Sequence, residues 1–351
     1  MDGRLLIYGA NGYTGELIAR LAVEHGLRPT LSARRSEAIA PLAKELGLEC
    51  EVVSLDDTAA LDALLSRHDV VLHCAGPFTH TARPMAEACL RTKTHYLDIT
   101  GEIEVFELMH HLGPAAAAAG VMLLPGVGFD VVPSDCLAAH LAKLMPQATS
   151  LSLAFLSLGG LSRGTATTMA ENMGRGGAVR RDGRIVPVPP AWKMRHIDYG
   201  TGPIASVSIP WGDVSTAFYS TGIPNIIVYM ATPTKLRWSM RATRYLGPLL
   251  QVGPVKRWLV ARAQARRPGP NEAQRRRGFS LLWGEACDAS GRSVSVRMRT
   301  PNGYTLTAQT AVAIAERVLS GKVTPGFQTP SMLLGADFIL TIREVARAEV
   351  A

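Results

Sequence analysis

The chain has 351 residues, of which 47% are hydrophobic and 19% are charged, and it carries a formal net charge of +8. This length and apolar content allow a folded core and favour two domains. The longest apolar stretches are interrupted by Gly, Pro or Asp before they reach the roughly 18 residues that a membrane span needs. The amino terminus is punctuated too early for a signal peptide. We therefore expect a cytoplasmic protein without a membrane span.

Cysteine and histidine are not arranged for a disulfide framework or a metal site. The five cysteines occur singly, without a CxxC pair, and their odd number favours reduced thiols. His110 and His111 are adjacent, so on a helix their side chains would point about 100° apart and make a poor chelating pair. The sequence predicts no metal site.

Short apolar runs alternate with amphipathic stretches through the first 130 residues. The runs have strand length, and the stretches carry apolar residues at helical spacing. The predicted strands are 4–8, 28–35, 49–57, 69–76 and 94–100, with a sixth before residue 130, and the predicted helices between them are 16–26, 36–47, 58–68 and 84–92. This alternation predicts an α/β fold of the Rossmann type, a doubly wound parallel sheet with helices on both faces.

The pattern changes after residue 130. Residues 149–158 alternate in polarity, and 205–232 and 280–311 have the turns and alternation of antiparallel meanders. We predict a second α+β domain built on a mostly antiparallel sheet. The predicted division is 1–130 for the Rossmann domain, 131–325 for the substrate domain with a basic helical insertion at 234–277, and 326–351 for a closing segment that returns to the Rossmann domain.

The sequence GANGYTG follows the first predicted strand and opens the first predicted helix. Its glycines, 9, 12 and 15, have the spacing of a dinucleotide-binding turn. Glycine permits the tight turn, the close approach of the backbone to a pyrophosphate, and the close packing of the helix. The amide groups at the helix start favour an anion. The predicted cofactor contacts in this turn are Gly9, Ala10, Asn11, Gly12, Tyr13, Thr14 and Gly15.

The end of the second predicted strand indicates which dinucleotide binds. An NAD site places an acidic residue there to accept a hydrogen bond from the ribose 2′-hydroxyl. This strand instead ends in Arg34 and Arg35. Guanidinium groups suit a 2′-phosphate because they form planar, charge-assisted hydrogen bonds with it. The predicted cofactor is NADP(H), bound in part by these two arginines.

Longer motifs resemble a known family. GANGYTG with SARR, CAGPFTHTARPMAEACLRTKTHYLDITGE and PGVGFDVVPSDCLAAHLA together resemble the saccharopine dehydrogenase-like family of NADP-binding oxidoreductases, over residues 1–145. The motifs LSRGTATTMAEN, PGPNEAQRRRG, NGYTLTAQTAVAIAERVL and TPGFQTPSMLLGADFI are similar to the carboxyl-terminal domain of the trans-acting enoyl reductases, which reduce a carbon–carbon double bond on lipid or polyketide chains. The resemblance implies that the AGPF turn runs along the cofactor, through Ala75, Gly76, Pro77 and Phe78.

The site should lie at the carboxyl ends of the parallel strands, where doubly wound sheets bind ligands. The fifth strand ends in the sequence LDITGE, residues 97–102. Asp98 and Gly101 are predicted to border the cofactor, and Asp98 is also expected to anchor neighbouring turns by hydrogen bonds. Glu102 lies beyond the glycine and is predicted to reach the nicotinamide region.

The predicted catalytic residues are Glu102, Tyr13 and Arg163, the last from a Gly-rich loop of the second domain. Further candidates for the proton donor are His95, Tyr96, Asp130, Ser162 and Thr165. His95 and Tyr96 begin a strand and are expected at the opposite end of the sheet. Asp130 and Asp135 are interpreted as structural, with Asp130 or Ser134 capping the helix that begins near Pro133.

The positive charge is concentrated in residues 234–277, where twelve Lys and Arg stand against the single acid Glu272. Arg237, Arg241 and Arg244 form a stripe of like charge at helical spacing, which destabilises a helix unless a partner or solvent screens it. A localised basic face argues against nucleic-acid binding. An anionic membrane surface, an acyl carrier protein and a merely solvated surface all stay open as interpretations, as does a homodimer.

The predicted function is NADPH-dependent reduction of an activated carbon–carbon double bond in a hydrophobic acyl or isoprenoid-like substrate, free or bound to a carrier. One alternative is an imine or amino-acid reductase of the saccharopine type. A second is a non-catalytic NADP-binding adaptor at a membrane or lipid surface. Peripheral association of the cytoplasmic protein with a membrane stays open.

Overall fold

The computed structural model describes residues 3–158 and 160–350, which fold into two compact units. The first unit comprises Met1–Val132 and Tyr304–Leu333, and the second comprises Pro133–Gly303 and Leu334–Ala351. The chain therefore leaves the first unit once, returns to it near residue 304, and leaves it again near residue 334.

This division differs from the predicted one at the carboxyl-terminal side. The helix α12, Gly303–Leu319, was expected in the second domain but lies almost wholly in the first unit. Of the closing segment 326–351, only the part up to Leu333 belongs to the first unit. The reason is strand pairing: β15, Gly326–Phe327, adds to the first sheet, whereas β16, Ala346–Val350, adds to the second.

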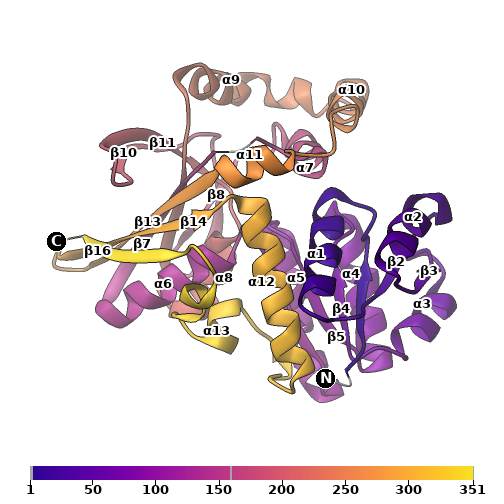
Figure 1. Ribbon diagram of the computed structural model, residues 1–351. Helices are drawn as coiled ribbons and strands as arrows, with labels where there is room; N and C mark the ends of the chain where they lie inside the picture. Colours follow the sequence, from indigo (N-terminus) through magenta and orange to yellow (C-terminus); the bar gives the residue numbers. More distant parts are fainter. Residues whose placement is uncertain (1–2, 159, 351) are drawn as a thin grey trace. The chain divides into compact units, whose positions relative to one another are not determined.

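The first unit is built on a seven-stranded parallel sheet with the strand order β15-β6-β5-β4-β1-β2-β3 (Figure 1). Its first six strands are β1 Leu5–Tyr8, β2 Thr30–Ala33, β3 Cys50–Val52, β4 Val70–His73, β5 His95–Asp98 and β6 Met122–Leu124. The order reverses beside β1, which pairs with both β2 and β4. This is the doubly wound arrangement that the alternating pattern predicted, and its reversal point is where such sheets bind ligands.

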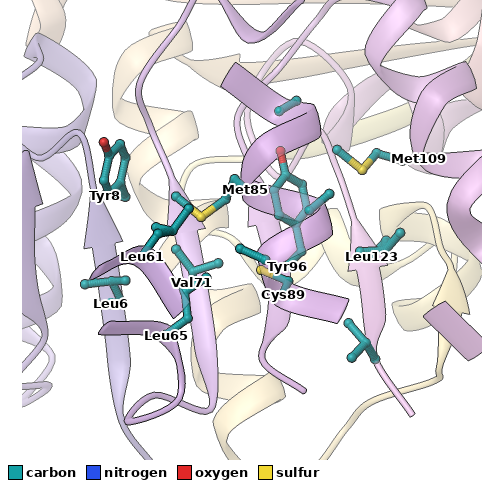
Figure 2. Close-up of a cluster of buried hydrophobic side chains, with 14 of the residues drawn as sticks. Leu6, Tyr8, Leu61, Leu65, Val71, Met85, Cys89, Tyr96, Met109 and Leu123 are labelled. Atoms are coloured by element: carbon teal, nitrogen blue, oxygen red, sulfur yellow. The ribbon is translucent and has the colours of Figure 1, made fainter. Parts of the chain in front are cut away.

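Helices cover both faces of this sheet because successive strand residues are apolar on both sides. The helices that follow the strands are α1 Tyr13–Glu24, α2 Ser36–Leu46, α3 Thr58–Leu65, α4 Phe78–Thr92 and α5 Ile103–Ala119. Figure 2 shows one face, where Leu6, Val71 and Tyr96 of the strands meet Leu65 of α3 and Met85 of α4. Each such buried apolar side chain contributes roughly 1.5–3 kcal/mol.

The second unit is built on a mostly antiparallel sheet, as predicted, with the order β10-β11-β12-β7-β13-β14-β16. The pair β12 and β7 is parallel, and the hairpin of β8 and β9 joins the sheet through β12. The remaining strands are β7 Ala148–Ser157, β8 Gly177–Arg181, β9 Arg184–Val188, β10 Met194–Asp198, β11 Pro203–Ile209, β12 Asn225–Ala231, β13 Phe279–Asp288 and β14 Ser293–Pro301.

Helices and an apolar cluster complete the second unit. The helices are α6 Val132–Leu144, α7 Arg163–Asn172, α8 Asp213–Thr221, α9 Thr234–Leu250, α10 Gly253–Gln264, α11 Glu272–Arg277 and α13 Pro330–Leu334, which begins in the first unit, with the short 3-10 helix Phe338–Thr341. Helix α6 packs closely on one face of the sheet, where a Cβ on Gly284 would lie only 2.6 Å from Leu141. Apolar residues that include Tyr229, Leu281 and Trp283 form a second cluster.

The basic segment forms three helices. Helix α9 extends from Thr234 to Leu250, and Gly253-Pro254 begins α10. None of the helices in the described part of the chain combines the length and apolar character that a membrane crossing requires.

Candidate functional site

The backbone of the glycine turn between β1 and α1 is bonded to the neighbouring strand β2. Gly9 has a positive φ of 84°, and its amide donates to the carbonyl of Ser32, with an N···O distance of 2.7 Å. A Cβ on Gly15 would lie 2.5 Å from the carbonyl oxygen of Gly9, so α1 can approach the turn this closely only with glycine at that position. The turn therefore has the close packing that the glycine spacing predicted.

The start of α1 is suited to a pyrophosphate. Gly12 occupies the N-cap position, where it has no side-chain oxygen to accept hydrogen bonds from the amides of the first turn. These amides and the helix dipole favour an anion. The residues of this turn thus fit a dinucleotide, which would be held by backbone groups of residues 12–15.

Arg34 and Arg35 directly follow β2 and are exposed. In the part of the chain that the structure describes, neither guanidinium forms a hydrogen bond or an ion pair with the protein. Arg35 is the N-cap of α2 but makes no capping side-chain bond. Two uncommitted guanidinium groups at the end of the second strand fit a 2′-phosphate better than a 2′-hydroxyl.

The turn Ala75–Phe78 connects β4 to α4 and contains a cis Gly76–Pro77 peptide bond. The Thr81 hydroxyl donates to the carbonyl of Ala75, at 2.7 Å, and lies 3.0 Å from His73 Nε2. Burial lowers the pKa of His73 to about 3, so this imidazole is neutral and acts as a structural partner of Thr81. The side chains of His73 and Thr81 thus hold the turn that is predicted to border the cofactor.

Glu102 holds the same turn from the neighbouring strand. Its two carboxylate oxygens accept hydrogen bonds from the amides of Phe78, at 3.1 Å, and Thr79, at 2.7 Å. The side chain therefore caps α4, where the helix dipole also favours a carboxylate. Burial raises its pKa, and the two amides lower it. Both oxygens are engaged, so the geometry gives Glu102 a positioning role and its catalytic role stays a prediction.

Asp98 anchors the end of β5. Its buried carboxylate accepts hydrogen bonds from the Tyr96 hydroxyl at 2.6 Å, from the Thr100 amide at 3.0 Å and from the Gly126 amide at 2.8 Å. Burial raises the pKa of Asp98 to about 6, against the opposing effect of these hydrogen bonds. The expected anchoring of neighbouring turns by Asp98 is present, and any contact of Asp98 with the cofactor stays a prediction.

Asp130 differs from both carboxylates. It is only partly buried, and its side chain has no hydrogen-bond partner in the described part of the chain. Asp130 therefore does not cap α6, which begins at Val132, and the alternative cap Ser134 stays a prediction. A Cβ on Gly101 would lie 2.7 Å from Asp130 Oδ2, so glycine at 101 makes room for this carboxylate. Burial and the charge of Glu102 raise its pKa to about 7.

The loop that carries Asp130 is fixed by groups far away in the sequence. The amide of Val127 donates to the carbonyl of Asp98, at 2.7 Å. The Thr307 hydroxyl accepts from the Phe129 amide, and the Thr310 hydroxyl donates to the carbonyl of Val127. Sequence reasoning missed both threonines because it assigned their helix to the other domain. Their spacing on the buried face of α12 was the available signal.

The other predicted site residues are distributed over both units. Tyr13 begins α1, and its ring packs edge-on against that of Tyr304, with centroids 5.1 Å apart. His95 lies at the amino end of β5, as expected, where its Nδ1 accepts from the Met122 amide. Arg163 belongs to the second unit and begins α7, and its amide donates to the carbonyl of Pro268. Catalytic roles for Tyr13 and Arg163 stay predictions.

Comparison with known protein families identifies the first unit. Residues 5–124 match the saccharopine dehydrogenase NADP binding domain. The nucleotide-binding part of the first unit is thus similar to this domain family. This match agrees with the glycine turn and with the two arginines after β2, and it confirms NADP(H) as the cofactor.

Curated relatives carry two kinds of name. The trans-acting enoyl reductase of Mycobacterium leprae (strain TN) is 36% identical over 141 residues, which cover 37% of this chain and 33% of that protein. The saccharopine dehydrogenase-like oxidoreductase of Rattus norvegicus is 29% identical over 152 residues, which cover 38% of this chain and 35% of that protein. The matched region is thus about a third of each relative. Both relatives are named as a reductase or an oxidoreductase.

The fold also has a solved counterpart over its whole length. An apo histidine-tagged saccharopine dehydrogenase (L-Glu forming) from Saccharomyces cerevisiae superposes with a TM-score of 0.68 at 14% identity, covering 100% of both chains. At this identity the likeness shows a shared fold. It confirms the predicted combination of a Rossmann-type unit with a second α+β unit.

Proposed function

We propose that the chain uses NADPH to reduce an activated carbon–carbon double bond in a hydrophobic acyl or lipid-type substrate. The observation that carries the proposal is the uncommitted carboxylate of Asp130 at the edge of the NADP-binding sheet. The name of the mycobacterial relative supports this type of reaction. Its match is confined to about a third of that protein, so the substrate is part of the proposal.

NADPH supplies a hydride to one carbon of such a bond, and the protein has to supply a proton to the other. We assign the proton to a carboxyl oxygen of Asp130. A carboxyl group with a pKa of about 7 is protonated in a substantial fraction of molecules at neutral pH, and a group of this kind can donate a proton and regain it from water. Asp98 and Glu102 are less suited to this role because their oxygens already accept hydrogen bonds.

The remaining groups of the site position the cofactor and the proton donor. Backbone amides at the start of α1 would bind the pyrophosphate, and Arg34 and Arg35 would bind the 2′-phosphate. Glu102 keeps the Ala75–Phe78 turn against the end of β5 through its two amide contacts. Gly101 leaves the space in which the carboxyl group of Asp130 can turn toward a substrate.

An apolar substrate is supported by the state of the arginines on the second sheet. Arg180 is buried and donates to the carbonyls of Val214 and Gly183. Arg195 forms a bidentate ion pair with Glu285, with both N···O distances 2.7 Å. Because these guanidinium groups are committed to the protein, they are not free to bind the carboxylates of an amino-acid substrate.

A second candidate is reduction of an imine formed from an amino acid. The names of the mammalian relatives favour it, since they are described as saccharopine dehydrogenase-like. It would require guanidinium groups that bind carboxylates, and Arg163 at the start of α7 is exposed and could serve. This reaction is the alternative that the following experiment separates from the first.

The test is NADPH oxidation by the purified full-length chain with two substrate classes. One is a series of α,β-unsaturated acyl thioesters of increasing chain length, and the other is a 2-oxo acid mixed with an amino acid. We expect turnover with the thioesters, rising with chain length, and a product heavier by two hydrogens in mass spectrometry. Turnover with the second class alone would replace the proposed reaction by the alternative, and no turnover with either would favour the non-catalytic adaptor.

A further inference from the structure

Helices α9 and α10 of the second unit carry positive charge without any acid. Seven Lys and Arg fall between Thr234 and Gln264, and that stretch contains no Asp or Glu. Figure 1 shows α9 and α10 set off from the sheet of their unit, with α7 and α11 nearer to it. A cationic helix pair of this kind attracts an anionic partner over distances up to the Debye length.

The same two helices expose aromatic side chains. Trp238 and Tyr245 of α9 are 67% and 87% exposed, and Trp258 of α10 is 59% exposed. In the described part of the chain these are the three most exposed large apolar side chains. Trp and Tyr each combine a large apolar surface with a polar group, and several of them exposed on the same pair of helices indicate a candidate interaction surface.

Exposed aromatic and basic residues lie near one another on each of the two helices. Trp238 and Tyr245 are seven residues apart, which is close to two helical turns, and Lys235, three residues before Trp238, is exposed on the same side of α9. On α10 the guanidinium of Arg262 lies 5.7 Å from the ring centre of Trp258. We call these five residues the docking face.

Other sides of the two helices are anchored within the second unit. Leu259, Val260 and Ala263 of α10 pack against α7. Arg244 of α9 donates to the carbonyls of Pro190 and Ala191, at 2.8 and 2.6 Å. The predicted basic stripe Arg237, Arg241 and Arg244 is therefore divided, because Arg244 holds α9 in place instead of serving as a free charge.

We propose that the docking face binds the surface of an anionic lipid bilayer, with Trp238, Tyr245 and Trp258 at the level of the headgroups. Aromatic side chains that combine an apolar ring with a polar group prefer this interface, and neighbouring arginines can reach the lipid phosphates. An acidic protein would match the charge, but it would not require three separate aromatic rings open to solvent on two helices. The attachment is peripheral.

The test is sedimentation of the full-length protein with vesicles of two compositions. Vesicles of phosphatidylcholine alone present no net negative charge, whereas those mixed with phosphatidylglycerol do. We expect binding to the mixed vesicles only, a decrease in binding with added salt, and a blue shift of tryptophan fluorescence on binding. Equal binding to both compositions, or binding to neither, would overturn the proposal.

Two variants locate the contact. Lys235→Glu, Arg257→Glu and Arg262→Glu together, which change exposed basic residues in the docking face and the one that directly precedes Trp258, should weaken binding to the mixed vesicles by at least about tenfold. The control is Arg184→Glu, Lys322→Glu and Arg343→Glu, which changes the net charge equally at exposed positions outside the two helices. An equal loss in the control would mean that net charge alone causes binding, and it would overturn the docking face.

The second variant tests the aromatic rings. Trp238→Ala, Tyr245→Ala and Trp258→Ala together should weaken binding severalfold, whereas Met194→Ala, Met332→Ala and Leu340→Ala, at other exposed apolar positions, should not. Binding of wild-type protein to a purified acidic acyl carrier protein but not to vesicles would replace the lipid by a protein partner. The vesicle assay needs no substrate, so its result is independent of the NADPH turnover that tests the proposed function.

Discussion

The carboxyl edge of the first sheet and the docking face of the second unit differ in whether their side chains are buried and bonded within the protein or exposed to solvent. At the sheet edge, Asp98 and Glu102 are buried, and each accepts hydrogen bonds from two backbone amides. On the docking face, Trp238 and Tyr245 are open to solvent beside basic residues. Buried polar groups determine the shape of a site because an unpaired one is costly, whereas exposed groups are free to bind a partner.

Asp130 is the exception at the sheet edge, and its removal should have the largest effect. We expect Asp130→Asn to lower NADPH-dependent turnover of the substrate by about 10²- to 10⁴-fold, because the proton donor is lost. NADPH binding, measured by fluorescence titration, should change little. The matched control is Glu102→Gln, which should lower stability more than turnover. The reverse pattern would make Glu102 the catalytic group.

The titration of Asp130 should be visible in two pH profiles, that of turnover and that of the free energy of unfolding. If protonated Asp130 donates the proton, turnover falls as pH rises through about 7, and Asp130→Asn has no such limb. A carboxyl pKa near 7 in the folded protein, against about 3.9 when unfolded, means that the folded state binds more protons between these values. The contribution of Asp130 to the free energy of unfolding should therefore fall between pH 4 and pH 7, roughly, and vanish in the Asn variant.

Asp98 tests whether the sheet edge depends on buried hydrogen bonds. We expect Asp98→Ala to lower the free energy of unfolding by about 3 kcal/mol, because the amides of Thr100 and Gly126 and the Tyr96 hydroxyl lose their acceptor. Urea unfolding measures this change. Asp98→Asn keeps one acceptor oxygen and should cost less, and equal stability of the Ala variant and the wild type would contradict the anchoring role.

Arg34 and Arg35 lie near the sheet edge but are exposed, like the docking face, so they should act on binding and not on stability. Replacing both with Ala should weaken NADPH binding by about tenfold to a hundredfold, as expected for the loss of charge-assisted hydrogen bonds. NADH binding should be nearly unchanged, since it has no 2′-phosphate. Equal losses for the two cofactors, measured by calorimetry, would argue against the assignment.

Replacing Arg244 should have the smallest effect of these substitutions. Arg244→Ala removes its hydrogen bonds to the carbonyls of Pro190 and Ala191, and we expect a local loss of about 1 kcal/mol. Hydrogen exchange should become faster in α9 and around residue 190, while NADPH turnover stays unchanged. A global loss of stability would mean that α9 is part of the core of its unit, and the contrast between the two regions would disappear.

Sequence reasoning was most successful where the controlling physics is local. The spacing of glycines 9, 12 and 15 and the arginines after the second strand identified the cofactor turn, because a tight turn and a helix start depend on adjacent residues. It was least successful with α12, whose partners lie far away along the chain. The bond between Phe129 and Thr307 joins residues 178 positions apart, a distance at which periodicity carries no information.

The sequence by itself therefore determined the Rossmann-type alternation, the NADP-binding turn and the concentration of charge in residues 234–277. Only the tertiary structure decided which carboxylate is an anchor, which is a cap and which is uncommitted, because hydrogen-bond partners come from separate strands and loops. It likewise decided that Arg244 is an anchor while Trp238 and Tyr245 face solvent. The residue type determines which groups a side chain can bind. The fold determines whether that side chain forms hydrogen bonds within the protein or is available to an external ligand.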